Sequence, residues 1–177
     1  MPFHFADLDD QTRRFMLDEV EQDLANNNLY LSPRLSEAGL RDYPDALRTA
    51  SRSGNEVTLA TVLRGSGRIR QSEERRTRSG RITIVRVPVT APETLAEGEF
   101  NRFYARGLCR RALAEGVKEV EIYRAKEVAS PRPESQTKIG RRIDAAQLLL
   151  DLRSHPGVEP ALGLPPGPNS GLSVRLP

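Results

Sequence analysis

Apolar residues recur at three- and four-residue steps through the N-terminal part of the chain, which is the spacing of one helix face. Asp7 is placed to start a helix whose apolar positions extend to Leu24, just before three consecutive asparagines. Ser32 and Asp42 each stand shortly before a proline, which favours further helix starts, and a short helix is expected over residues 55–63. Such short helices are marginal alone, so this helical subdomain needs packing from elsewhere.

Two stretches are rich in β-branched residues and predict strands. Residues 81–89 carry them on both faces, which is typical of a largely buried strand, and Pro88 should end it. Residues 117–125 alternate, with Val120 and Ile122 on one face and mostly charged residues on the other. Two strands do not make a stable sheet, so we expect further strands from another part of the chain or from a partner.

The segment between these strands predicts a long helix. Thr90 and Glu93 have the spacing of a capping box, with a proline in the first turn, and the helical pattern continues to Glu115. Strand, helix and strand in this order predict a βαβ-like unit around a central amphipathic helix. Asp144 should cap a last helix, which carries leucines on more than one face. The expected fold class is therefore α+β.

Proline and glycine are frequent from residue 156 to the last residue, 177, which disfavours a helix and predicts an extended C-terminal arm. Residues 171–177 alternate apolar and polar positions, as in a short strand that needs a sheet edge. Disorder is the ordinary alternative for such a segment. The apolar residues favour docking on a neighbouring subunit, and the predicted docking residues are Leu164, Leu172, Val174 and Leu176.

Charge divides the chain unevenly. The 177 residues include 27 Lys and Arg against 24 Asp and Glu, for a net charge of +3, and residues 1–62 hold eleven acidic residues against six arginines. Residues 64–80 are rich in arginine and contain one apolar residue, Ile69, so they cannot bury themselves and should be a mobile or partner-ordered connector. The expected organisation is an acidic helical subdomain, this connector, an α/β core and the arm, at residues 1–63, 64–80, 81–155 and 156–177.

Two sets of arginines are candidates for partner contacts. On the central helix they recur every four residues beside an aromatic face, where they form either a solvated face or a row that meets phosphates or a partner's carboxylates. The connector arginines would bind nucleic acid by counterion release, or would pair with acidic protein surface. The candidate contact residues are Arg64, Arg68, Arg70, Arg75, Arg76, Arg78, Arg102, Arg106 and Arg110.

Signals for catalysis are weak. Glu99 with Glu119, Glu121 and Lys126 has some similarity to the cluster of metal-dependent nucleases, in which carboxylates hold Mg²⁺ and a lysine positions water, but the Glu-x-Lys spacing is missing. Cys109 has arginine neighbours that could lower a thiol pKa, although a cysteine in a helix is more often a core residue. The two histidines lie at opposite ends of the chain, so we predict no metal site and no cofactor.

The sequence also indicates a compartment. It contains no long apolar run and no basic start followed by an apolar stretch, so we expect neither a membrane span nor a secretory signal. A single cysteine cannot form an internal disulfide, which favours the cytoplasm.

These features favour one function over two alternatives. The prediction is a non-enzymatic structural or assembly subunit of a multi-subunit particle, of which a viral particle is one example by analogy. Its partners would be other protein subunits, in a homo- or hetero-oligomer, and no membrane is expected. The alternatives are a protein that binds nucleic acid without sequence specificity and a Mg²⁺-dependent nuclease-like enzyme.

Overall fold

The computed structural model describes residues 2–65, 67–156 and 170–177. Helices and strands alternate irregularly along these residues, which confirms the predicted α+β class. The elements in chain order are α1 (Asp10–Ala25), α2 (Glu37–Ser53), α3 (Glu56–Arg64), β1 (Ser72–Arg76), β2 (Ile82–Arg86), α4 (Ala91–Ala114), β3 (Glu119–Arg124), α5 (Pro133–Gln136), β4 (Arg142–Asp144), α6 (Ala145–Ser154) and β5 (Leu172–Arg175).

Side-chain caps start the three N-terminal helices. The carboxylate of Asp9, rather than that of Asp7, accepts from the first backbone N–H groups of α1. A single helix, α2, begins after Ser36, so the predicted helix starts at Ser32 and at Asp42 were both wrong. Pro44 lies inside α2, where the burial of Tyr43 and other core residues outweighs the backbone hydrogen bond that the proline cannot make. The predicted short third helix is confirmed as α3 and has a full capping box.

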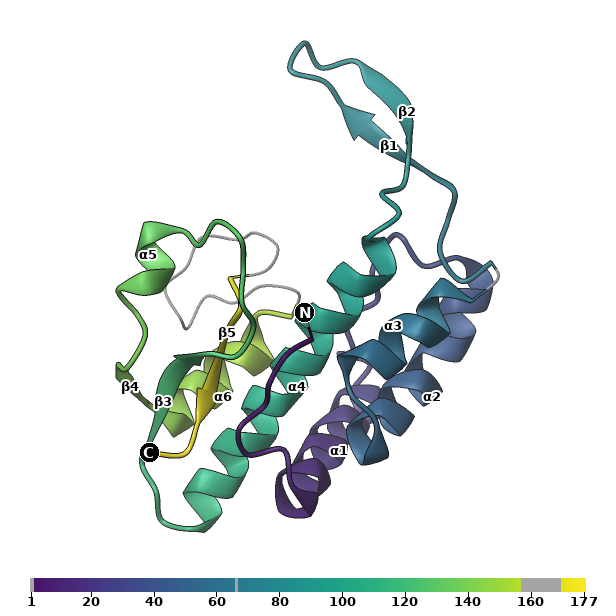
Figure 1. Cartoon of the computed structure of the whole chain (residues 1–177). Helices are drawn as coiled ribbons and strands as arrows, with labels where there is room; N and C mark the ends of the chain where they lie inside the picture. The colour runs from purple at the N-terminus through teal and green to yellow at the C-terminus, as the bar shows by residue number, and fades with distance from the viewer. Residues whose placement is uncertain (1, 66, 157–169) are drawn as a thin grey trace.

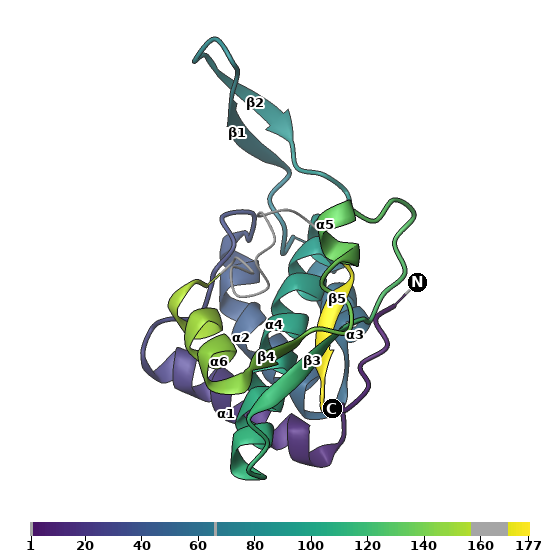
Figure 2. The ribbon, with the colours of Figure 1, turned by 90° about the vertical axis from the view of Figure 1, so that its left-hand side faces the viewer.

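Helix α4 runs through the middle of the molecule (Figures 1 and 2). Helices α1 and α3 pack along it, and α6, β3 and β5 contact it as well. Every residue from Phe100 to Cys109 is buried, so the helix is enclosed rather than amphipathic as predicted. Gly107 allows the closest approach, because an added Cβ there would lie 2.7 Å from the backbone nitrogen of Met16 in α1. The buried apolar side chains of the N-terminal helices and of the C-terminal part form one cluster.

The larger sheet has the strand order β4-β3-β5, and both of its pairings are antiparallel. Val120 and Ile122 of β3 are buried, as the alternation predicts. The predicted βαβ-like unit was wrong, because β2 pairs with β1 in a separate two-stranded sheet and does not join β3. Asp144 caps α6 as predicted by accepting from the N–H of Gln147, 2.8 Å away.

The strand predicted near the C-terminus is confirmed as β5, but its predicted docking on a neighbouring subunit was wrong. It pairs with β3 of its own chain, and Leu172 and Val174 are buried in the core while Leu176 packs at its edge. The side chain of Asn101 in α4 donates to the carbonyl of Leu172, 2.9 Å away. Leu164 lies outside the described residues. Within the described ranges, no helix has the length and apolar content that crossing a bilayer requires.

Candidate functional site: a projecting hairpin

Strands β1 and β2 form an antiparallel hairpin that stands away from the rest of the molecule (Figures 1 and 2). The register runs from Ser72 opposite Arg86 to Arg76 opposite Ile82. Thr77 and Gly80 close the turn: the N–H of Gly80 donates to the carbonyl of Thr77, and Gly80 has a φ of +84°. Residues 72–80 of the arginine-rich stretch thus belong to a β-hairpin, whereas a mobile or partner-ordered connector was predicted for residues 64–80.

The base of the hairpin is fastened to the helical part. The guanidinium of Arg34 donates to both carboxylate oxygens of Glu73, over 2.6 and 2.8 Å. Arg68 pairs with Asp42 at 2.8 Å, and the side chain of Arg70 donates to a backbone carbonyl 3.1 Å away. Arg64, the last residue of α3, pairs with a glutamate of α4. Three of the predicted contact arginines therefore bind groups of their own chain, and two of them, Arg68 and Arg70, lie next to the base of the hairpin.

Opposite residues of an antiparallel pair share a face, so the hairpin has two distinct faces. The face that we call the Ile82/Ile84 face carries both isoleucines together with Glu74, Arg76 and Arg86. Ile82 is 55% exposed and Ile84 is 77% exposed. The prediction that residues 81–89 form a buried strand was therefore wrong, because the described parts of the chain do not cover these side chains. A small apolar surface framed by arginines results.

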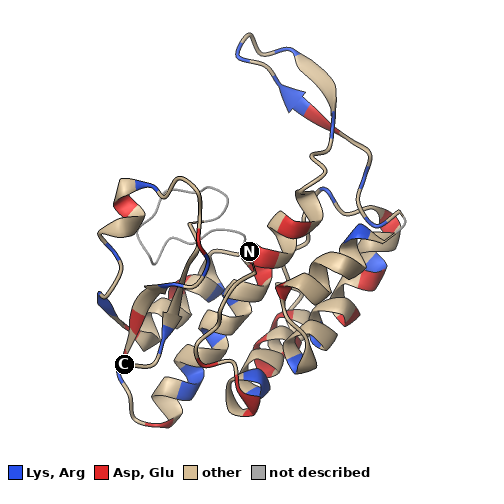
Figure 3. Ribbon diagram, viewed as in Figure 1, with Lys and Arg blue, Asp and Glu red and all other residues tan. Residues whose placement is uncertain are grey.

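The outer arginines of the hairpin are open to solvent. In the described residues, their side chains make no hydrogen bond and no ion pair, whereas Glu73 is already neutralised by Arg34. Figure 3 shows basic residues along the hairpin, with an acidic segment in β1, and mixed charges over the helices. The outer arginines are Arg75, Arg76, Arg78, Arg81 and Arg86.

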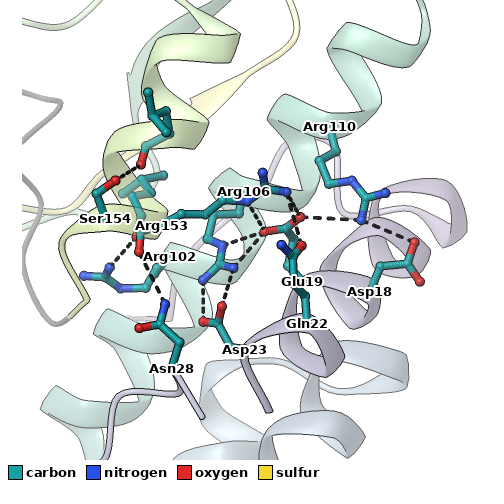
Figure 4. A network of polar contacts seen from close by, with 12 residues as sticks. Asp18, Glu19, Gln22, Asp23, Asn28, Arg102, Arg106, Arg110, Arg153 and Ser154 are labelled. Atoms are coloured by element: carbon teal, nitrogen blue, oxygen red, sulfur yellow. Dashed lines mark hydrogen bonds and ion pairs between the residues drawn. The ribbon is translucent and has the colours of Figure 1, made fainter. Parts of the chain in front are cut away.

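The arginines of α4 have a different place, shown in Figure 4. Arg106 is 1% exposed and makes three short hydrogen bonds, one to Glu19 and two to Asp23, over 2.6–2.8 Å. Arg102 is also buried and donates to the carbonyls of Leu152 and His155, each 2.9 Å away. Their predicted contact with a partner was wrong, because their guanidinium groups are used inside the chain.

Arg110 is the most accessible of the three predicted contact arginines on α4 and lies 3.5 Å from Asp18 and 3.4 Å from Glu19. Arg106 and Arg110 therefore meet carboxylates of α1 of the same chain, whereas the interpretation from the spacing was that the row meets phosphates or a partner's carboxylates. A signal for this was present: Glu19 and Asp23 stand four residues apart, within the apolar pattern of the first helix.

The pKa values of two buried glutamates in this region, Glu19 and Glu99, shift in opposite directions. Burial alone would raise the pKa of Glu19, but hydrogen bonds from Arg153 and Arg106 hold it below its usual range. Burial raises the pKa of Glu99 to about 7, because Arg102, 3.5 Å away, offsets only part of the lost hydration. Within the described chain, Oε2 of Glu99 and the hydroxyl of Tyr43 have no hydrogen-bond partner. Glu99 thus changes its charge near neutral pH.

The residues of the nuclease-like pattern are not brought together. Glu99 is buried in α4, whereas Glu119 and Glu121 alternate with the core-facing residues of β3 and so lie on the other face of the sheet. Lys126 pairs with Glu97 at 2.5 Å. The described ranges contain no group of three or more His, Cys, Asp or Glu side chains arranged to hold a metal ion. Burial raises the pKa of the Cys109 thiol to about 12, opposite to the activation by arginines considered from the sequence.

Comparisons with known proteins assign this chain to no family. No protein-family model matches the chain, and no curated protein or solved structure is detectably similar to it. Function is therefore argued from the hairpin itself.

Proposed function

We propose that the protein is a non-enzymatic assembly subunit that binds a neighbouring protein through its hairpin. The observation that supports this is the exposed pair Ile82 and Ile84 on an ordered segment that stands away from the core. Burying one isoleucine side chain contributes about 1.5–3 kcal/mol before the costs of association. The two isoleucines are neighbours on one face of the strand. They form an apolar centre whose exposure to water is unfavourable.

The hairpin has further features of a docking element. It is two-stranded, so each strand has one outer edge whose backbone groups can pair with a strand of a partner. Arg76 and Arg86 flank the isoleucines on the same face and would meet carboxylates around the partner's apolar site. The anchoring of the base by Arg34 and Glu73 reduces the freedom that binding would otherwise remove.

The experiment that tests the proposal places a photoreactive phenylalanine derivative at position 84 in living cells. We expect illumination to produce a covalent adduct with one protein, identified by mass spectrometry. The substitution Ile82→Glu in the same chain should suppress this adduct, because it places a charge in the apolar centre. The matched control carries the derivative at Val57, an exposed apolar position on α3, and should give no adduct. Absence of a protein adduct at position 84 would contradict the proposal.

A second candidate function is binding of nucleic acid, favoured by the outer arginines that are not paired within the described chain. A two-stranded ribbon fits the major groove of DNA, and each neutralised phosphate releases a counterion. The test is a salt titration with duplex DNA and with RNA, on the natural chain and on Arg76→Ser/Arg78→Ser/Arg81→Ser. Binding at about 50 mM salt that the triple variant loses would support this function, and no binding at that salt would exclude it.

The proposal includes a location in the cytoplasm. Cys109 is a buried free thiol and the chain has no second cysteine, which suits a reducing compartment. Fractionation of cells that make the protein, followed by detection of the chain in each fraction, tests this part.

A further inference from the structure

A groove between β4 and α6 is acidic, whereas the hairpin is rich in arginine. Its volume is about 530 Å³, and Leu150, 66% exposed, stands at its edge. Two carboxylates, those of Asp144 and Asp151, line it, and its described lining contains neither lysine nor arginine. The lining residues are Ile143, Asp144, Gln147, Leu148, Leu150, Asp151, Ser154 and His155.

We infer that this groove receives the hairpin of a second copy of the chain. The inference rests on the proposed function, that the hairpin binds protein, and adds the identity of the partner and of its surface. Ile82 and Ile84 bury their side chains against Leu150 and Ile143, and the flanking arginines meet Asp144 and Asp151.

The order and spacing of the groups support this match. On the Ile82/Ile84 face, Arg76 lies opposite Ile82, and Arg86 lies two residues beyond Ile84, so the basic groups are separated by roughly 14 Å of strand. Asp144 and Asp151 are two helical turns apart, roughly 10 Å along α6, and the exposed Leu150 directly precedes Asp151. The two basic groups can therefore face the two carboxylates, and the long arginine side chains can close the difference. Glu74, opposite Ile84 on the same face, adds one acidic group between the arginines, so the isoleucines and Leu150 supply the attraction at the centre of the contact.

The positions of the two surfaces determine the kind of assembly. In Figures 1 and 2 the hairpin points away from β4 and α6, and its base is held by Arg34, so it does not fold back onto its own groove. The two surfaces differ, so one contact leaves a hairpin free on one copy and a groove free on the other. Such a contact continues head to tail into a ring or a filament, or closes as a two-fold dimer when two copies exchange hairpins reciprocally.

The closing experiment uses two variants with exposed substitutions, Ile84→Glu in the hairpin and Leu150→Arg in the groove. Sedimentation velocity from about 1 µM to about 1 mM should show concentration-dependent oligomers for the natural chain and monomers for each variant. Val57→Glu, which changes an exposed apolar residue of α3 in the same way, is the matched control and should assemble like the natural chain. Circular dichroism melting checks that all variants fold.

Mixing the two variants tests directly whether the hairpin of one chain binds the groove of another. The hairpin of the Leu150→Arg chain is intact and so is the groove of the Ile84→Glu chain, so an equimolar mixture should form a heterodimer and no larger species. Charge reversal gives a second measurement: Asp151→Arg should weaken assembly about tenfold or more. Of the two single changes Arg76→Asp and Arg86→Asp, the one at the arginine that faces position 151 should restore part of the loss when it is added to the same chain.

The possible outcomes separate the inference from the proposed function. A natural chain that stays monomeric over the whole range overturns the inference, and the photochemical experiment at position 84 then decides the proposed function independently. Oligomers that Ile84→Glu abolishes and Leu150→Arg leaves intact also overturn the inference, but they support the hairpin as a protein-binding element. Oligomers that persist in both variants overturn the assignment of both surfaces.

Discussion

Arginine has opposite roles in α4 and in the hairpin. In α4, Arg102 and Arg106 are buried and their guanidinium groups are used by carbonyls and carboxylates of the same chain. In the hairpin, Arg76 and Arg86 lie beside exposed isoleucines and have no such partner in the described chain. The charge of an arginine therefore does not determine whether it faces solvent. What decides is whether packing brings an acceptor to it, because a buried guanidinium without one is very costly.

The largest effect is expected from removing a buried arginine of α4. Arg106→Leu leaves the carboxylate of Asp23 buried without its bidentate partner, so the free energy of unfolding should fall by about 3–5 kcal/mol. Urea denaturation measures it. Arg86→Leu is the matched change on the hairpin and should stay within about 0.5 kcal/mol. Equal effects of the two substitutions would contradict the difference drawn between the regions.

The next effect concerns pH. The folded chain keeps the proton of Glu99 up to about pH 7, whereas the unfolded chain releases it near 4.5, so the free energy of unfolding should fall as pH rises between these values. The fall contributed by this one group is about 3 kcal/mol. Glu99→Gln should remove it when stability is measured by urea denaturation at pH 5 and pH 8. Glu119→Gln, at an exposed position, should leave the pH dependence unchanged.

A smaller effect is expected where an arginine caps a helix. Arg102→Met removes the hydrogen bonds to the carbonyls of Leu152 and His155 at the C-terminal end of α6, at a cost of about 1–3 kcal/mol. Amide hydrogen exchange should become faster in α6 than in α2, because the loss is local. Uniform acceleration over all helices would show that Arg102 supports the whole core instead.

A still smaller effect tests the anchoring of the hairpin. Arg34→Ala removes a partly exposed ion pair with Glu73, so we expect only a small loss in the free energy of unfolding. Amide exchange in β1 should nevertheless increase, because this pair fixes the base of the strand. Arg48→Ala, which removes the comparably exposed ion pair with Glu21 far from the hairpin, should leave that exchange unchanged.

The smallest effect on the free energy of unfolding is expected from the exposed arginines of the hairpin. The triple variant Arg76→Ser/Arg78→Ser/Arg81→Ser should keep its free energy of unfolding within about 0.5 kcal/mol of the natural chain. Thermal denaturation at low and high salt checks this. A larger loss would mean that these arginines stabilise the fold and are not reserved for a partner.

Local rules were enough for much of the fold. Asn55 and Asp144 cap α3 and α6 because a side-chain oxygen satisfies an N–H two or three residues ahead, which depends on neighbouring residues alone. The alternation of Val120 and Ile122 likewise places β3 correctly, since one face of the strand is buried.

Pairings over long sequence distances could not be predicted in the same way. Pairing β5 with β3 matches Val174 to Ile122, and nothing near either residue indicates it. Burial of Arg106 depends on the contact of α1 with α4, which brings Glu19 and Asp23 to it. The hairpin was missed for a different reason: Ser79-Gly80 is a turn signal, but β-branched residues on both faces were interpreted as burial.

The missing side chain of Gly107 has a consequence for the charges one residue away. An added methyl group would overlap the backbone of Met16, so even alanine would force α1 outward. Glu19 and Asp23 lie on that same helix and would move with it, away from Arg106. The tolerance of position 107 to mutation is therefore set by electrostatics as much as by space: a substitution that adds only carbon there acts as an indirect disruption of an ion pair.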